Sequence, residues 1–265
     1  MINRTTISAI RVAAAALLLG MLVQTAQANR RHFTYTYESP VLPSGSREIE
    51  IWNTLRTDKG AFFRGLDHRM ELEWGLGAGL QSSLYFNLSS ESAADGLGGI
   101  ASESEYSFSN EWKWSLTNPV ADALGSALYA EWTVEHDATE LEGKVILDKQ
   151  VGNLLFAANG TFEHEFPALG NETNNTAEAT LGIAYLIDEF SVGIEARHHT
   201  RTIGEESYSG LFVGPSLSFS GKNWWAAASV MPQIGIGANK NNTNENLELL
   251  EHEKLEVRFL LSFEL

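Results

Sequence analysis

Residues 66–88 read LDHRMELEWGLGAGLQSSLYFNL, and this stretch decides the fold. Hydrophobic and polar side chains alternate along residues 66–74, pause at the glycine-rich residues 75–79, and alternate again along residues 80–88. Alternation with a period of two indicates a β-strand with two unlike faces, and the short glycine-rich break indicates a hairpin. Such a hairpin fits a surface sheet with one wet face or a transmembrane barrel. The polar face of its first half carries four charged side chains: Asp67, Arg69, Glu71 and Glu73.

The first 28 residues have the three parts of a secretory signal peptide. A basic start with Arg4 and Arg11 precedes an apolar run at residues 12–23, and the small residues Ala26 and Ala28 follow. A run of about a dozen residues is too short to cross a bilayer as a helix, which disfavours the alternative of a membrane anchor. We therefore predict cleavage after Ala28 and export of the chain. Because no later apolar run approaches the length of a membrane helix, the mature chain would enter a membrane only as strands.

Composition excludes several classes of function. Removing residues 1–28 leaves 16 Lys and Arg against 34 Asp and Glu, a formal charge of −18. Binding to nucleic acid or to anionic lipid favours the opposite sign. The chain has no cysteine, and its mean hydropathy is slightly negative at −0.15, which is unusual for a helical membrane protein and ordinary for a barrel. No linker divides the mature chain, so we predict a lead-in at residues 29–45 and one barrel at residues 46–265.

The alternating pattern recurs along the whole mature chain. Residues 207–220 fit least well because Pro215 removes a ladder donor, so we expect a bulge or a weak rim there. The other segments are clear. The predicted strands lie at about residues 46–57, 66–74, 80–88, 102–116, 124–135, 139–150, 153–165, on both sides of 187–189, at 207–220, from 224 onward, and at 254–265.

The connections between these strands sort by parity. Those after even strands are short, at residues 75–79, 117–123, 151–152, 187–189 and 221–222, and those after odd strands are longer and polar, at residues 89–101, 167–175, 200–206 and 236–250. Short turns on one side and longer loops on the other are typical of outer-membrane barrels, and a soluble sandwich would not sort its connections in this way. The fold class predicted is therefore all-β, a transmembrane antiparallel up-and-down β-barrel of about 12 strands with short periplasmic turns and longer extracellular loops. The location predicted is the outer membrane of a Gram-negative cell.

Three stretches carry a resemblance to a known family. Residues 31–35, 48–55 and 71–88 resemble a family of small, porin-like proteobacterial outer-membrane β-barrels of unassigned function. The resemblance covers most of the mature chain and implies the fold and the location, but it carries no catalytic residue. The last strand, with Phe263 and Leu265 outward, is similar to the recognition strand of such barrels. We therefore expect outer-membrane lipid, lipopolysaccharide and the outer-membrane assembly machinery as partners, and no nucleic acid.

No motif predicts catalysis, a cofactor or a metal site. A barrel phospholipase would need a His-x-Ser pair on one strand, and neither this pair nor a Gly-x-Ser-x-Gly elbow occurs in the sequence. His164 stands between two glutamates, and His198 and His199 are adjacent. Neighbouring strand residues point to opposite faces, so neither group would converge on one ion. We predict that the protein is not an enzyme.

Two functions remain open for the predicted lumen. It is either a narrow channel whose acidic lumen passes small cationic or neutral solutes, or a salt-bridged closed barrel with a structural, adhesive or sensing role. The inward acids outnumber the inward bases, which favours a hydrated channel and small solutes as partners. The predicted lumen-lining residues are Arg69, Glu71, Glu73, Glu103, Glu105, Glu111, Lys113, Glu131, Glu142, Lys144, Glu163, Glu195, Arg197, Glu256 and Arg258.

Overall fold

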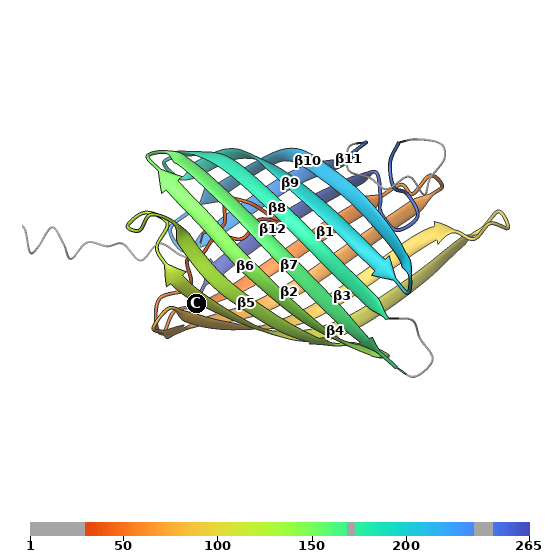
Figure 1. The fold of residues 1–265 in the computed structure, drawn as a ribbon, viewed down its shortest axis with the longest axis horizontal. Coiled ribbons are helices and arrows are strands. Elements are labelled where there is room, and N and C mark those ends of the chain that lie inside the picture. The colour runs from red at the N-terminus through yellow and green to blue at the C-terminus, as the bar shows by residue number, and fades with distance from the viewer. Residues whose placement is uncertain (1–29, 169–172, 236–245) are drawn as a thin grey trace, which may run out of the picture.

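Twelve antiparallel strands close into one barrel by pairing of the first strand with the last (Figure 1). This computed structural model describes residues 30–168, 173–235 and 246–265, so the predicted signal peptide lies outside the described residues. The predicted fold class is confirmed. The strands are β1 (Arg47–Thr57), β2 (Phe63–Gly77), β3 (Leu80–Ala94), β4 (Ile100–Thr117), β5 (Gly125–Val134), β6 (Ala138–Val151), β7 (Leu154–Pro167), β8 (Asn174–Ile187), β9 (Phe190–Ile203), β10 (Glu206–Ser220), β11 (Trp224–Ile234) and β12 (Leu255–Glu264).

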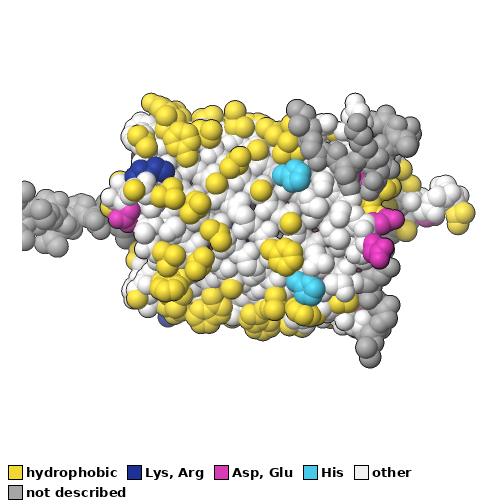
Figure 2. Space-filling model, viewed as in Figure 1, with side chains coloured by type: hydrophobic (Ala, Val, Ile, Leu, Met, Phe, Trp, Pro, Cys, Tyr) yellow, Lys and Arg dark blue, Asp and Glu magenta, His cyan; other side chains and the backbone are white. Residues whose placement is uncertain are grey.

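The period of two assigns one side chain in two to the outer surface and the next to the interior. Leu84, Val145 and Ile183 are about half exposed on the outside, while Ser83 and Thr133 are buried inside. Figure 2 shows hydrophobic side chains spread over the visible face of the barrel, with acidic side chains near both of its ends and Lys or Arg side chains near the left end. An apolar band between polar ends is the surface that a bilayer requires of a barrel. In the described part of the chain, no helix is long and apolar enough to cross a membrane.

Pro215 does not cause the expected bulge. β10 keeps the same register with β11 on both sides of it, with Phe212 opposite Gln233 and Ser216 opposite Ser229. The pairing is interrupted between these positions because Pro215 in β10 and Pro232 in β11 have no N–H to donate. Of the two predicted alternatives, a bulge or a weak rim, the bulge is absent, and the weakness takes the form of a gap in the ladder between β10 and β11. Register shifts occur elsewhere, at residues 75–77 and 115–117.

Two of the predicted long loops consist mostly of strand. Within residues 89–101 only the turn at 95–99 lies outside β3 and β4, and within residues 200–206 only 204–205 lies outside β9 and β10. The hairpin of β3 and β4 projects beyond the barrel (Figure 1). Cross-strand pairs of small polar side chains extend these hairpins, as in the 2.8 Å hydrogen bond between the Ser92 and Ser102 hydroxyls.

The N-terminal segment, residues 30–46, forms no strand and packs inside the barrel at the end that holds the C-terminus (Figure 1). Phe33, Thr34 and Thr36 have no exposed surface. The segment therefore occupies the interior that the strands enclose. The division of the chain at residue 45 remains a prediction.

Candidate functional site

Aromatic side chains anchor the N-terminal segment to the inner wall. Phe33 packs against Leu155, Ala157 and Ala184, from β7 and β8. Gly182 of β8 makes room for this ring, since a Cβ atom there would lie 2.7 Å from Phe33 Cζ. The segment thus rests in apolar recesses built from small residues of the barrel wall. Tyr35 packs in a cluster with Phe212 and Met231, and the Tyr37 ring contacts the rings of Trp52 and Tyr129.

One buried carboxylate binds the backbone of this segment. Glu195 of β9 has no exposed surface and accepts hydrogen bonds of 2.9 Å from the N–H groups of Thr34, Tyr35 and Thr36. The Thr34 hydroxyl donates a further bond of 3.1 Å to it. Hydrogen bonds to a charged acceptor are stronger than neutral ones. The Glu195 carboxylate therefore accepts the backbone hydrogen bonds that the carbonyl groups of a neighbouring strand would otherwise accept.

Other inward side chains hold the rest of the segment. Asn159 of β7 accepts a 2.6 Å bond from the Tyr37 N–H and donates a 3.0 Å bond to the Tyr37 carbonyl. Gln81 accepts from the Leu42 N–H at 2.8 Å, and Lys113 donates to the Pro40 carbonyl at 2.8 Å. The segment is thus bonded to strands on several sides of the barrel.

Burial changes the acid–base behaviour of two groups in this segment. Burial, reinforced by Arg30, lowers the pKa of His32 to about 3, so the docked segment holds this imidazole neutral. Burial raises the pKa of Glu38 to about 7, against the opposing effect of Arg31. The Glu38 carboxylate also accepts a 2.8 Å bond from the His32 N–H.

Beyond the N-terminal segment the lumen widens into a vestibule of about 400 Å³. Tyr35 and Tyr37 form part of its floor, and the guanidinium of Arg258 stacks 3.7 Å from the centre of the Tyr35 ring. The charged lining consists of seven carboxylates and four cationic side chains: Asp67, Glu131, Glu135, Glu140, Glu142, Glu163 and Glu178 with Arg69, Lys144, Arg197 and Arg258.

Ion pairs neutralise part of this lining. Arg197 bridges Glu178 at 2.5 Å and Glu256 at 2.7 Å, and Lys144 contacts Glu142 at 2.9 Å. Within the described residues, no basic side chain lies within 4 Å of the Glu140 or Glu163 carboxylates. These two half-buried carboxylates therefore have no direct counter-ion among the described residues.

The strand register aligns acidic residues into one row along the inner wall. The row consists of one position on each strand from β1 to β7, each directly paired with the next. Because the strands of a barrel are tilted, the row runs obliquely along the inner wall, from the end of the barrel that holds the C-terminus toward the vestibule. Like charges in directly opposite positions destabilise a sheet, so the row is not explained by stability. The acid row is Glu48, Glu73, Ser83, Glu111, Glu131, Glu142 and Glu163, in which only Ser83 is not acidic.

The structure brings most of the predicted lumen residues together. Glu103 and Glu105 are exposed near the tip of the β3–β4 hairpin, because β4 continues past the vestibule. The role of the others in solute passage remains a prediction. Those that lie on the inner wall, buried or half-buried, are Arg69, Glu71, Glu73, Glu111, Lys113, Glu131, Glu142, Lys144, Glu163, Glu195, Arg197, Glu256 and Arg258.

Sequence reasoning left out other acids that line the interior. Glu48 and Glu50 of β1 share the parity of the buried positions, and so do Glu140 and Glu178, which line the vestibule. Strand parity was the signal that could have found them. The contribution of residues 30–45 to the lumen had no such signal, because its partners lie far away in the sequence.

Comparison with known proteins identifies the family. The sequence profile of the "Family of unknown function (DUF6662)" matches residues 25–265. The chain belongs to this family. None of the curated proteins matches the sequence significantly. The family fixes no activity, so function must be argued from the lumen.

Solved structures share the fold of this DUF6662 protein. The COG4313 outer membrane channel from Pseudomonas putida F1 superimposes with a TM-score of 0.63 and 11% identity, covering 88% of this chain and all of that one. The NanC porin superimposes with a TM-score of 0.53 and 10% identity, and the match covers 82% of this chain and 100% of the porin. The β domain of the Bordetella autotransporter BrkA superimposes with a TM-score of 0.52 and 10% identity, and the match covers 84% of this chain and 100% of that domain. Together with the closed barrel and its apolar belt, these likenesses make the DUF6662 protein a β-barrel of the cell outer membrane.

Proposed function

We propose that this DUF6662 protein is a narrow outer-membrane channel whose acidic lumen favours small cations and also passes small neutral solutes. The acid row carries this proposal. Acidic rings and rows raise the local concentration of cations in a narrow, water-filled passage. The unpaired Glu140 and Glu163 carboxylates of the vestibule support the same sign of selectivity.

The barrel fold alone does not distinguish a channel from other kinds of outer-membrane barrel. Two of the similar structures are named as a channel and a porin, and a third is the β domain of an autotransporter. The choice rests on the interior of the DUF6662 barrel. A row of like charges lowers the stability of the barrel. Attraction of cations into a channel would be a function for which these charges are needed.

The N-terminal segment sets the width of the proposed channel. It fills the lumen below the vestibule, where the space between Tyr37, Trp52 and the neighbouring glutamates is about 10 Å³. A lumen narrowed by this segment would suit ions and the smallest solutes and would exclude larger ones. Small solutes, outer-membrane lipid, lipopolysaccharide and the assembly machinery are the partners that this proposal retains.

A closed structural barrel is the second candidate, and the same segment favours it. Its hydrogen bonds to Glu195 and Asn159 would seal the barrel if they never open. In that case the acid row would be balanced by bound cations or protons and would conduct nothing.

Conductance across a planar bilayer separates these candidates. The purified, refolded protein should give discrete conductance steps in KCl, and a variant without residues 30–45 should give larger steps. If neither protein conducts although both are folded, the closed barrel is the correct description. If only the shortened variant conducts, the intact protein is not a channel and the N-terminal segment is its plug.

A further inference from the structure

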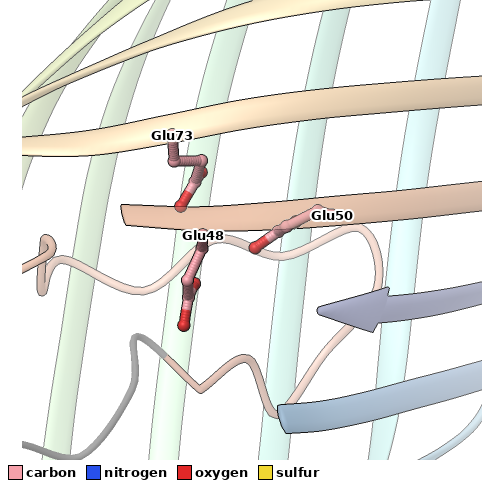
Figure 3. Close-up of side chains that lie close together, drawn as sticks. All are labelled: Glu48, Glu50 and Glu73. Carbon is pink, nitrogen blue, oxygen red and sulfur yellow. The ribbon is translucent and has the colours of Figure 1, made fainter. Parts of the chain in front are cut away.

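Three buried carboxylates converge below the N-terminal segment. Glu71 and Glu73 of β2 and Glu111 of β4 each offer an oxygen atom, and these three atoms lie within 4.8 Å of one another. All three side chains are at least 95% buried. A second group shares Glu73, as Figure 3 shows for Glu48, Glu50 and Glu73, which lie close together with their oxygens also within 4.8 Å. The interior of the barrel thus gathers four glutamates around Glu73.

A small space lies between these carboxylates. It measures about 10 Å³, and Glu48 does not line it. Its charged lining consists of five carboxylates and two cationic side chains: Glu38, Glu50, Glu71, Glu73 and Glu111 with Arg31 and Lys113. A volume of about 10–15 Å³ accommodates a single water-sized particle. The space therefore matches one ion or one water and nothing larger.

Several buried polar atoms beside this space have no hydrogen-bond partner among the described residues. Both carboxylate oxygens of Glu71 and of Glu111 lack a hydrogen-bond partner among the described residues, as does one oxygen of Glu73. The Ser83 hydroxyl is likewise unpartnered and fully buried, and Ser83 stands on β3 directly between Glu73 and Glu111. Buried polar atoms without partners cost free energy, and charged ones cost more. This independent observation indicates that something else binds them.

Arg31 and Lys113 also line this space, but among the described residues neither donates a hydrogen bond to the three carboxylates. Lys113 donates to the Pro40 carbonyl at 2.8 Å, and Arg31 donates to the Thr34 carbonyl and stacks 4.0 Å from the centre of the Tyr37 ring. In the described part of the chain, no ion pair within 4 Å joins either of them to Glu71, Glu73 or Glu111. The negative charge of the group is therefore not neutralised by direct contact.

We propose that Glu71, Glu73 and Glu111 bind a hard divalent cation, Ca²⁺ in preference to Mg²⁺. Carboxylate oxygens are the ligands that both ions favour, and Ca²⁺ accepts irregular arrangements whereas Mg²⁺ demands a near-ideal octahedron. Glu71 and Glu73 project from β2 and Glu111 from β4, with Ser83 of β3 between them, an arrangement fixed by the sheet that Ca²⁺ would accept more readily than Mg²⁺. This site revises the expectation that the protein has no metal site.

The cation would also tie the N-terminal segment to the wall. Gln81 donates to Glu73 at 3.0 Å and accepts from the Leu42 N–H at 2.8 Å, so the site and the segment share a residue. Binding of a ligand to the folded state stabilises it. Ca²⁺ should therefore raise the thermal stability of the barrel and slow hydrogen exchange near residue 42.

Calcium binding to refolded protein in zwitterionic detergent, free of lipopolysaccharide, tests the proposal without reference to conductance. Terbium luminescence sensitised by tryptophan and its displacement by Ca²⁺ provide the readout, since Trp52 donates a 2.7 Å bond to Glu50 beside the site. We expect saturable binding with a dissociation constant on the order of 10⁻⁴–10⁻³ M, the range of extracellular calcium modules. Mg²⁺ should compete more weakly than Ca²⁺.

Charge-removing variants assign the site. Glu73→Gln and Glu111→Gln should each weaken Ca²⁺ binding by about tenfold or more, because each removes a charged ligand. Glu103→Gln removes the same charge from the exposed β3–β4 hairpin and should leave binding unchanged. Circular dichroism and heat-modifiable mobility in gels confirm that each variant is folded, and either of the two site variants suffices if the other fails to fold. Absence of saturable binding by the wild type, or equal weakening by Glu103→Gln, would overturn the proposal.

Discussion

Glu111 of β4 and Glu131 of β5 lie directly opposite each other on the inner wall of the barrel, and both are buried. The pairing repeats on either side, with Ser83 opposite Glu111 and Glu142 opposite Glu131. Opposite positions hold like charges less than about 6 Å apart at the backbone, an arrangement that a sheet selected for stability avoids. A barrel that retains it needs cations, protons or water beside these carboxylates, and the proposed channel and the proposed calcium site each meet this need.

Arginine substitutions should distinguish the two faces of the barrel. Leu84→Arg and Ile183→Arg place a charge on the apolar outer surface and should each destabilise the barrel by about 2–4 kcal/mol in lipid. Thr133→Arg faces the vestibule and its carboxylates, so it should cost clearly less. Urea titrations of refolding into lipid vesicles measure these differences. Equal costs for the two kinds of variant would mean that the strand register is displaced by one residue.

A single methyl group should loosen the N-terminal segment without changing any charge. Gly182→Ala would bring a Cβ atom to 2.7 Å from the Phe33 ring, and overpacking of this kind costs about 1–3 kcal/mol. We expect faster hydrogen exchange at residues 33–37 and larger conductance steps. Gly160→Ala is the matched control, because a Cβ atom there meets nothing within 4 Å. If both variants behave like the wild type, Phe33 does not anchor the segment.

The binding of the N-terminal segment inside the barrel, called docking below, should depend on pH through two groups with opposite effects, His32 and Glu38. The released segment protonates His32 near its ordinary pKa of 6.5, whereas the docked segment holds its pKa at about 3, so the docking contribution of His32 is present above pH 6.5 and is lost as the pH falls. Glu38 acts in the opposite direction. Its docked pKa is about 7 against an ordinary 4.5, so its contribution is present below pH 4.5 and is lost as the pH rises through 7.

Single variants should expose each contribution. His32→Asn leaves Glu38 in control, so docking should be tighter at pH 5 than at pH 7.5, and Glu38→Gln should give the reverse order, by up to about tenfold per pH unit. Hydrogen exchange at residues 33–37, corrected for the intrinsic effect of pH, is the measurement. A shift in the same direction for both variants would contradict the assigned pKa directions.

The period of two was enough to predict the barrel. The hairpin expected within residues 66–88 is β2 and β3, and the predicted strand at 139–150 differs from β6 by one residue at each end. The pattern is strong because lipid outside and polar groups inside impose unlike faces on every strand. It also misled where polar residues continue a strand past the membrane, since Glu103 and Glu105 have inward parity and are exposed.

The interior was harder to predict than the wall. Alternation of Phe33, Tyr35 and Tyr37 resembles a strand, yet the backbone at residues 34–37 bonds to the Glu195 and Asn159 side chains rather than to a neighbouring strand. No local pattern marks a partner so distant in the sequence. The acid row is likewise invisible before the register is known, because each glutamate lies on a different strand.

The reversal potential of the wild-type protein in a planar bilayer under a KCl gradient tests the central claim most directly. We expect discrete channels whose reversal potential shows a preference for K⁺ over Cl⁻, which weakens in high salt as screening shortens to about 3 Å at 1 M. Combined replacement of Glu131, Glu142 and Glu163 by glutamine should move this potential toward zero while the protein remains folded. A folded wild-type protein that never conducts, or one that prefers Cl⁻, would contradict the proposed function.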